Sequence, residues 1–198
     1  GLLVPRVGGP SVHPYQPPGL WKEISHFGST PATKQAFVQD HGEKLYRRSL
    51  YTIVKRTSPH PAMAAFDAPN REMCVVDRSK TNTPLQALVT LNDPQFAEAS
   101  RVFAGSILQD QTANDDRSRI ERAFERISSR QPTGPEVTMI AQLLDAERAR
   151  FQKSPIDAER VIAVGEYPVT HDLDPVEQAA WTQIATLLLN LSEVLTRQ

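Results

Sequence analysis

The spacing of hydrophobic positions changes partway along the chain. Beyond residue 95, apolar residues recur with the 3.6-residue period of amphipathic helices whose apolar faces point into a core. Four long helices are expected there, with apolar faces spanning Phe96–Leu108, Ile120–Ile127, Val137–Phe151 and Trp181–Leu195, and a short helix is expected near Asp157–Ala163. Two helix starts carry caps, Thr133 with Glu136 and Asp174 with Glu177. The pattern therefore predicts an α-helical bundle over residues 95–198.

The first part of the chain has no such period and is rich in proline. Residues 1–94 contain 11 of the 16 prolines, five of them within the first 18 residues. Because proline fixes its own φ angle and moves its predecessor out of the α region, residues 1–43 are expected to be an extended wrap. Its expected anchors are Tyr15, Leu20 and Trp21.

Residues 44–94 form a mixed segment. We expect a helix over Glu43–Arg56, although its apolar positions fit neither period cleanly, then a turn at Phe66–Arg71 and a short extended piece at Met73–Val76. Cys74 lies in this apolar piece and is expected to be buried. The predicted fold class is mainly α, an irregular Pro-rich N-terminal half followed by a helical bundle, with at most a short β element. The chain is expected to be one domain or a C-terminal fragment of one, beginning at a cut helix end.

The densest polar sequence, residues 78–96, is here called the polar elbow. Thr83 and Pro84 mark a helix start, and Gln86 completes a capping box with Thr83. An apolar stripe follows over about two turns, formed by Leu85, Leu88, Val89 and Leu91, and Asn92-Asp93-Pro94 stops this helix and caps the next. The elbow is therefore expected to join two helices.

Charge is distributed unevenly between the two halves. Residues 1–91 hold 11 Lys/Arg against 6 Asp/Glu, and residues 92–198 hold 11 against 17, which gives +5 and −6. The first half could bind anions around Arg47, Arg48, Lys55 and Arg56, or the halves could pair with each other. The overall balance of −1 is unlike that of a nucleic-acid binder.

Several kinds of chemistry lack a signature in the sequence. The single cysteine excludes an internal disulfide, a thiolate metal cage and a covalent Cys-x-x-Cys-His haem attachment. The five histidines are scattered without metal-ligand spacing, so no metal site is predicted; one assembled in space from His13, His41 or His60 with Asp67 is the alternative. No phosphate loop or nucleophile elbow occurs, and the catalytic residues stay unknown. There is no apolar run long enough to span a membrane. Whether the chain is an enzyme stays open.

The candidate binding residues are polar side chains whose planar groups suit hydrogen bonding in several directions. They are Arg48, Asp67, Arg71, Arg78, Asn82, Asn92 and Asp93. Two interpretations remain open: an internal scaffold of turns and caps, or a surface for the hydroxyl and anionic groups of a saccharide.

A series of ordered motifs also carries a family resemblance. Gly8-Gly9-Pro10-Ser11-Val12, Gly19-Leu20-Trp21, Tyr46–Tyr51, Phe66–Pro69 and Thr81–Leu88 appear in that order, and the resemblance runs through nearly all of residues 1–198. The chain resembles the planctomycete-specific domain of unknown function found at the C-terminal end of planctomycete cytochrome c proteins. The resemblance implies preceding domains, one of them bearing haem c, and an exported, periplasmic or cell-surface location. Polysaccharide use is an association of that family.

Two functions follow as expectations. The leading one is an accessory or interaction module that packs against the preceding domains of the same polypeptide, with the polar elbow and the basic first half as its docking surface. The alternative is an anionic (sulfated or acidic) glycan-binding or glycan-processing domain lined by the candidate residues.

Overall fold

The computed structural model describes residues 1–24, 36–77 and 79–196. These fall into two compact units, Leu2–Gln86 and a helical unit from Ala87 to the C-terminal end. The boundary lies within helix α3 (Pro84–Asn92), so this one helix contributes residues to both.

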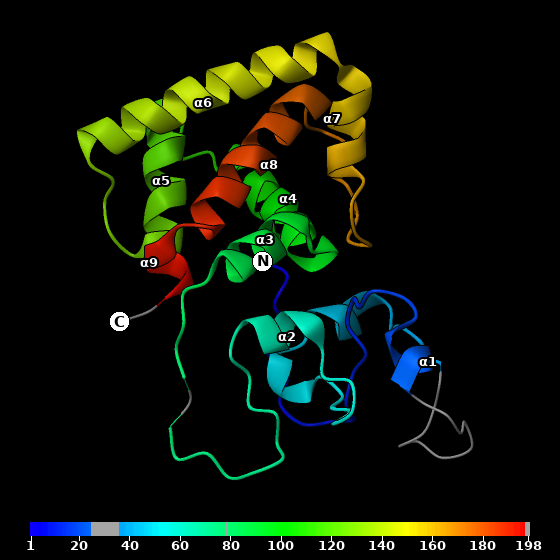
Figure 1. Ribbon diagram of the computed structural model, residues 1–198. Helices are drawn as coiled ribbons and strands as arrows, with labels where there is room; N and C mark the ends of the chain where they lie inside the picture. The colour runs from blue at the N-terminus through cyan, green and yellow to red at the C-terminus, as the bar shows by residue number, and fades with distance from the viewer. Residues whose placement is uncertain (25–35, 78, 197–198) are drawn as a thin grey trace. The chain divides into compact units, whose positions relative to one another are not determined.

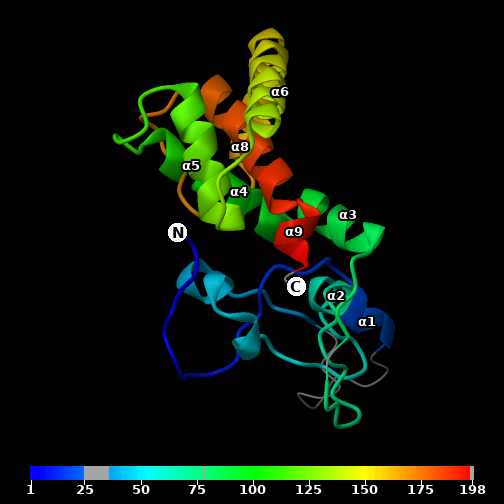
Figure 2. The same ribbon diagram turned by 90° about the vertical axis from the view of Figure 1, so that its left-hand side faces the viewer.

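The second unit is a bundle of helices built around α8. Its elements are α4 (Pro94–Leu108), α5 (Asp116–Ser128), α6 (Gly134–Lys153), α7 (Pro155–Ile162), α8 (Pro175–Leu189) and α9 (Ser192–Leu195). α8 packs against α4, α6 and α7, and α6 also contacts α5. Figures 1 and 2 show α6 lying across the bundle, with α8 between it and α4. α8 is accordingly buried around most of its circumference, including Gln178 and Thr182.

The core of this unit consists of the residues that the 3.6-residue period selected. Ile120 and Phe124 on α5, Ile140 and Leu144 on α6, and Trp181 on α8 are at most 5% exposed. The predicted short helix near Asp157–Ala163 is confirmed as α7. Burial of such side chains is the dominant favourable contribution to folding, about 1.5–3 kcal/mol for each large one.

The predicted helix caps are confirmed. The backbone N–H of Thr133 donates to the carboxylate of Glu136 at 2.6 Å, as a capping box requires. The carboxylate of Asp174 accepts from the N–H of Glu177 at 3.0 Å at the start of α8. These bonds satisfy backbone donors that the first turn of a helix leaves without a partner.

The first unit is largely irregular. Its helical pieces are short: α1 (Leu20–Ile24), the 3₁₀ turns η1 (Gly42–Tyr46) and η2 (Ser49–Tyr51), and α2 (Pro61–Ala65). Within the described residues, its β content is two isolated parallel bridges, Val4 with Arg47 and Val12 with Thr52. The predicted fold class, mainly α with at most a short β element, is confirmed.

The predicted helix over Glu43–Arg56 is wrong. The N–H of Val12 donates to the carbonyl of Tyr51 at 2.8 Å, and the N–H of Ile53 donates to the carbonyl of Val12 at 2.9 Å. Backbone groups that a helix would pair internally are therefore bonded to the Pro-rich wrap. The mixed periodicity of this segment reflects its two short 3₁₀ turns separated by extended residues.

The wrap is anchored largely as expected. Trp21 is 4% exposed, whereas Tyr15 and Leu20 are half-buried. The Trp21 ring packs edge-on against Phe37 at 5.2 Å between centroids, and the ammonium of Lys55 lies 4.6 Å from its centre. Trp21 therefore belongs to the interior of this unit and not to an exposed apolar patch.

No helix in the described part of the chain is long and apolar enough to cross a membrane.

Candidate interaction site

A polar cluster closes the loop that precedes α3. The carboxylate of Asp67 accepts from the backbone N–H of Thr81 at 2.8 Å and from its hydroxyl at 2.8 Å, and the amide of Gln86 donates to it at 3.5 Å. Asp67 adopts a left-handed φ of 56°, a conformation that aspartate tolerates better than most residues. The ends of the segment 67–81 are thus fastened together.

The tip of this loop is apolar and exposed. Met73, Val75 and Val76 are 72%, 55% and 106% exposed, and Cys74 is also at the surface. The prediction that Cys74 is buried is wrong, because the apolar run in which it lies extends into solvent. In Figure 1 the segment forms an open arch before α3. We call Met73–Val76 the apolar loop tip.

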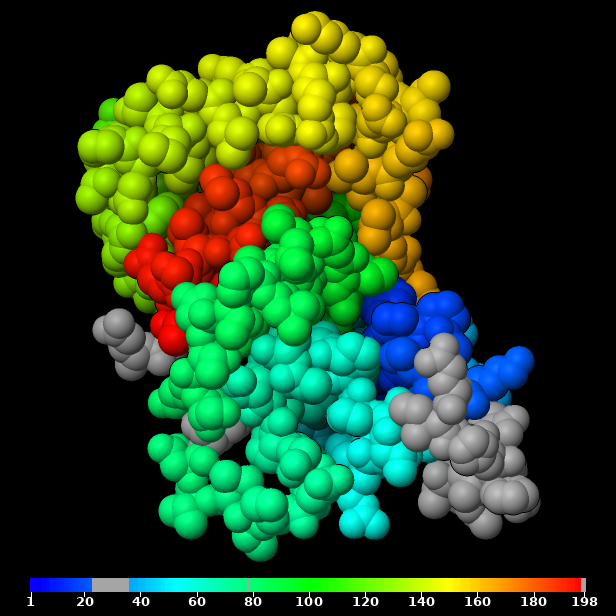
Figure 3. Space-filling view, viewed as in Figure 1, coloured from blue at the N-terminus to red at the C-terminus, as the bar shows by residue number. Residues whose placement is uncertain are grey.

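Helix α3 buries its polar side and exposes its leucines. Gln86 and Thr90 are each 2% exposed, whereas Leu85, Leu88 and Leu91 are 58%, 56% and 49% exposed. In the space-filling view, the green segment that includes α3 lies on the side that faces the reader (Figure 3). An amphipathic helix on a globular surface has the opposite orientation. We call these three residues the leucine row.

The buried side of α3 is held by hydrogen bonds. The predicted capping box is present: the N–H of Thr83 donates to Gln86 Oε1 at 3.3 Å, and the N–H of Gln86 donates to Thr83 Oγ1 at 3.4 Å. The Thr90 hydroxyl donates to Asn190 Oδ1 at 2.8 Å. Buried polar groups with such partners fix the rotation of the helix about its axis.

The seven sequence candidates do not converge on one described cluster. Arg48, Arg71 and Asn82 are exposed side chains of the first unit, and Asp67 closes the loop. Asn92 donates to the carbonyl of Leu88, and Asp93 caps α4 by accepting from the N–H of Gln95 at 2.9 Å, as the cap prediction requires. Arg78 lies outside the described residues. Binding roles for these residues stay predictions.

Two of the four cations proposed for an anion site serve the interior of the first unit. Arg47 is 5% exposed, donates to the carbonyls of Arg6 and Gly8 at 2.9 and 2.7 Å, and lies 3.8 Å from the centre of the Tyr51 ring. Lys55 lies over Trp21. Arg48 and Arg56 remain exposed.

Histidines and carboxylates form no metal-binding group among the described residues. His13 lies beside Asp40, with 3.4 Å from Nδ1 to the carboxylate, and His60 Nε2 lies 2.7 Å from the carbonyl oxygen of Tyr15.

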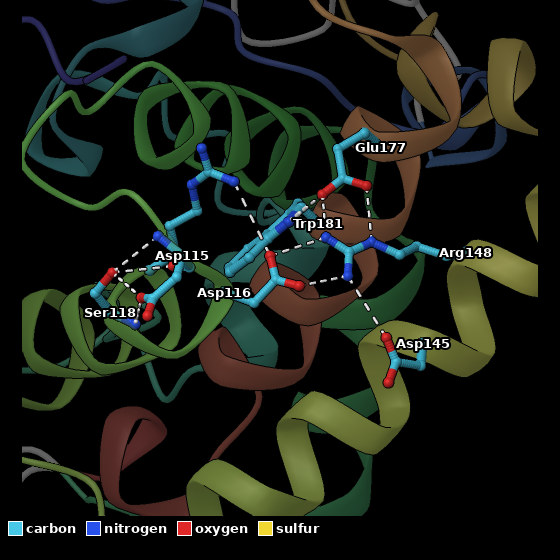
Figure 4. Close-up of polar contacts among 8 residues, drawn as sticks. Asp115, Asp116, Ser118, Asp145, Arg148, Glu177 and Trp181 are labelled. Carbon is cyan, nitrogen blue, oxygen red and sulfur yellow. Dashed lines mark hydrogen bonds and ion pairs between the residues drawn. The ribbon is translucent and has the colours of Figure 1, made fainter.

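The helical unit contains a charge network that the sequence did not reveal. Figure 4 shows Arg148 of α6 between Asp116 at the start of α5 and Glu177 at the start of α8. Its guanidinium donates to both oxygens of Asp116, at 2.6 and 2.9 Å, and Trp181 Nε1 donates to Glu177 at 2.9 Å. The hydrogen bonds from Arg148 lower the pKa of Asp116, and the hydrogen bonds to Glu177 and then to Asp116 raise the pKa of Arg148. This arginine therefore ties three helices together.

A second group, Glu98 and Arg101 of α4, holds the loop before α8. Glu98 is fully buried and accepts from the N–H of Tyr167 at 2.6 Å. Arg101, 1% exposed, donates to the carbonyls of Tyr167 and Pro168 at 2.6 and 3.2 Å. The sequence signal for this pair was the i, i+3 spacing of Glu98 and Arg101. Exposed ion pairs on helix surfaces have the same spacing, so the signal does not identify a buried pair. We read both groups as structural, because every partner named is a group of the same unit.

The comparisons with known proteins give one result. A family model described as PSD1, protein of unknown function (DUF1553), matches residues 1–144. No curated protein and no solved structure matches the chain. The matched part includes the Pro-rich wrap, the closed loop, α3, α4, α5 and the beginning of α6. Since the match covers well over half of the sequence, the chain belongs to this family of proteins of unknown function.

Proposed function

We propose that the chain is an interaction module that docks onto another folded protein through the apolar loop tip. The observation that carries the proposal is the exposure of Met73, Val75 and Val76 on a loop whose ends are fastened by Asp67. Contiguous exposed apolar side chains are typical of protein–protein contact sites.

Because the two ends of the loop are bonded together, the loop suits recognition of a partner better than a freely moving segment would. Asp67 bonds both the backbone and the hydroxyl of Thr81, so the tip is presented from a fixed pair of loop ends. Ordering a loop in advance reduces the entropy lost on binding. Deleting the Asp67 carboxylate is therefore expected to weaken docking although Asp67 need not touch the partner.

Charge indicates the kind of surface that would receive the loop. Glu72 and Asp77 flank the tip directly, Arg71 and Lys80 lie farther out, and all four are exposed. An apolar contact with a rim of mixed charge would match them. On the resemblance, we propose the preceding domains of the same polypeptide as the partner, in an exported, periplasmic or cell-surface protein. Haem c would be held by one of those domains, since this chain has a single cysteine.

The test is binding of the chain to the separately produced haem-bearing part of the longer protein, measured by biolayer interferometry. Replacing Met73, Val75 and Val76 by serine should weaken binding at least tenfold, which is about 1.4 kcal/mol. A matched control replaces Met139 and Ile156, which are 70% and 64% exposed on α6 and α7, by serine. Failure of the unaltered chain to bind, or equal losses in both variants, would refute the proposal.

A second candidate function, anionic glycan binding, is favoured by the exposed arginines. Among the described residues, Arg48 and Arg71 make no ion pair with a carboxylate. Asn82, the residue that follows the closed loop 67–81, is also exposed. Guanidinium groups bind sulfate and carboxylate in a bidentate manner. A sulfated polysaccharide titrated over a salt series should bind at low ionic strength and lose affinity in Arg48→Ala and Arg71→Ala. The absence of binding at low salt would end this candidate.

A further inference from the structure

We infer that the apolar loop tip docks by β-strand addition: its backbone pairs with the free edge of a β-sheet in the partner. The inference rests on the docking function proposed above and names the kind of surface that receives the loop. Every described residue from Pro69 to Asn82 is exposed, so the backbone of the tip is open to a partner. The tip residues have no regular secondary structure of their own.

The backbone of the tip offers the hydrogen bonds that strand addition uses. Within the part of the chain that the structure describes, the N–H and C=O groups of residues 73–76 have no hydrogen-bond partner. A row of unpaired backbone donors and acceptors is what one strand presents to the edge of another. The first unit already pairs its chain in this way at Val12, whose N–H donates to Tyr51 and whose carbonyl accepts from Ile53.

The order of the side chains favours a strand over a helix. The consecutive apolar residues Met73-Cys74-Val75-Val76 would point to all sides of a helical turn, because successive residues of a helix are rotated by about 100°. In a strand, Met73 and Val75 share one face, and Cys74 and Val76 share the other. Valine is favoured in strands, and a strand that is apolar on both faces is typical of a sheet covered on both sides. The receiving edge is therefore expected in a sheet of that kind.

The flanking residues limit the added strand to the tip. Glu72 and Asp77 bracket the apolar run and are exposed. Charged residues at the ends of an apolar strand stop the pairing from extending and protect the free strand from aggregation. Farther out, Asp67 accepts from the backbone N–H and the hydroxyl of Thr81, at 2.8 Å each, so the loop returns to its own base. The added strand is therefore no longer than residues 72–77, which is roughly 20 Å at the rise of a strand.

Paired substitutions at each tip position separate backbone pairing from side-chain contact. Proline and alanine both remove the original side chain, as in Val75→Pro and Val75→Ala, but only proline also removes the backbone N–H. Binding of the whole chain to the partner domains proposed above, produced separately, is measured by biolayer interferometry for both substitutions at positions 73, 74, 75 and 76. Successive N–H groups of a strand point in opposite directions. At one alternate pair of positions the proline variant should therefore bind roughly tenfold more weakly than the alanine variant, and at the other pair the two should agree within about twofold.

The matched control is Ser79→Pro with Ser79→Ala, because Ser79 is exposed in the same loop beyond the tip, and these two variants should bind alike. All variants should keep the far-UV circular dichroism of the unaltered chain, since the substituted tip positions make no backbone hydrogen bond within the described residues. Equal ratios of proline to alanine affinity at all four tip positions would overturn strand addition and leave docking through side chains intact.

Two further outcomes also decide against the inference. If the unaltered chain does not bind the partner domains, the docking function itself fails and strand addition fails with it. If the chain alone sediments as a dimer that the same alternate proline variants dissociate, a second copy supplies the edge, and the assignment to a partner's sheet is wrong.

Discussion

Gly165 is the position where one added methyl group should most damage the helical unit. It has a φ of 90°, and a Cβ atom there would overlap the carboxylate of Glu98, which is fully buried. Glu98 cannot move aside without losing its hydrogen bond from the N–H of Tyr167 at 2.6 Å. Gly165→Ala should therefore release the loop that Glu98 and Arg101 hold on α4.

The magnitude follows from two contributions. A non-glycine residue in this backbone region costs about 1–3 kcal/mol. Loss of a hydrogen bond to a charged group adds about 1.5–3 kcal/mol. Together they predict that the free energy of unfolding of the helical unit falls by about 3–5 kcal/mol.

Urea unfolding followed by far-UV circular dichroism measures this change, because most of the regular helix lies in this unit. Gly134→Ala is the matched control: it lies at the start of α6 in the same unit, and its Cβ would have nothing within 4 Å. Since alanine is the better helix former, the control should be neutral or slightly stabilising. A Gly165→Ala variant within about 0.5 kcal/mol of the control would contradict the proposed role of Glu98.

Three further predictions concern the same unit. Arg148→Met should lower the free energy of unfolding by about 1–2 kcal/mol, because it removes the hydrogen bonds to Asp116 and Glu177. This loss should be smaller at high salt, and an unchanged urea midpoint would contradict the network. Ser129→Gly should stabilise by about 0.5–1 kcal/mol, because Ser129 has a φ of 62° at the end of α5; a lower midpoint would contradict this. Hydrogen bonds from Arg130 and then from Thr133 lower the pKa of Glu136 from 4.5 to about 2, so its contribution is present above pH 4.5 and lost as the pH falls toward 2. Glu136→Gln should flatten the stability profile in that window only.

The sequence predicted those features that short-range chemistry determines. The bundle faces, the caps at Thr133 and Asp174, and the start of α3 at Thr83 depend on residues within one or two helical turns of each other. Periodicity also found an apolar stripe on α3 that includes the leucine row and Val89, but the period alone cannot show which face of a helix is covered. That depends on Thr90 meeting Asn190, a hundred residues away.

The errors have the same origin. The helix predicted over Glu43–Arg56 is wrong because this segment pairs with Val12, which lies about 40 residues away in the sequence. Periodicity within the segment cannot reveal such a distant partner. Cys74 was predicted to be buried because apolar runs usually enter a core, whereas this run lies at the tip of a loop closed by Asp67 and Thr81. Of the candidate site, the sequence supplied the residues of the polar elbow but not the exposed tip of the loop.

Hydrogen–deuterium exchange of the chain, with and without the partner domains proposed above, tests whether the apolar loop tip is a docking surface. Added partner should protect the backbone amides of residues 73–76 and leave α6 and α7 unchanged. This protection should disappear when Met73, Val75 and Val76 are replaced by serine. Unchanged exchange at residues 73–76 while the partner protects another surface would contradict it.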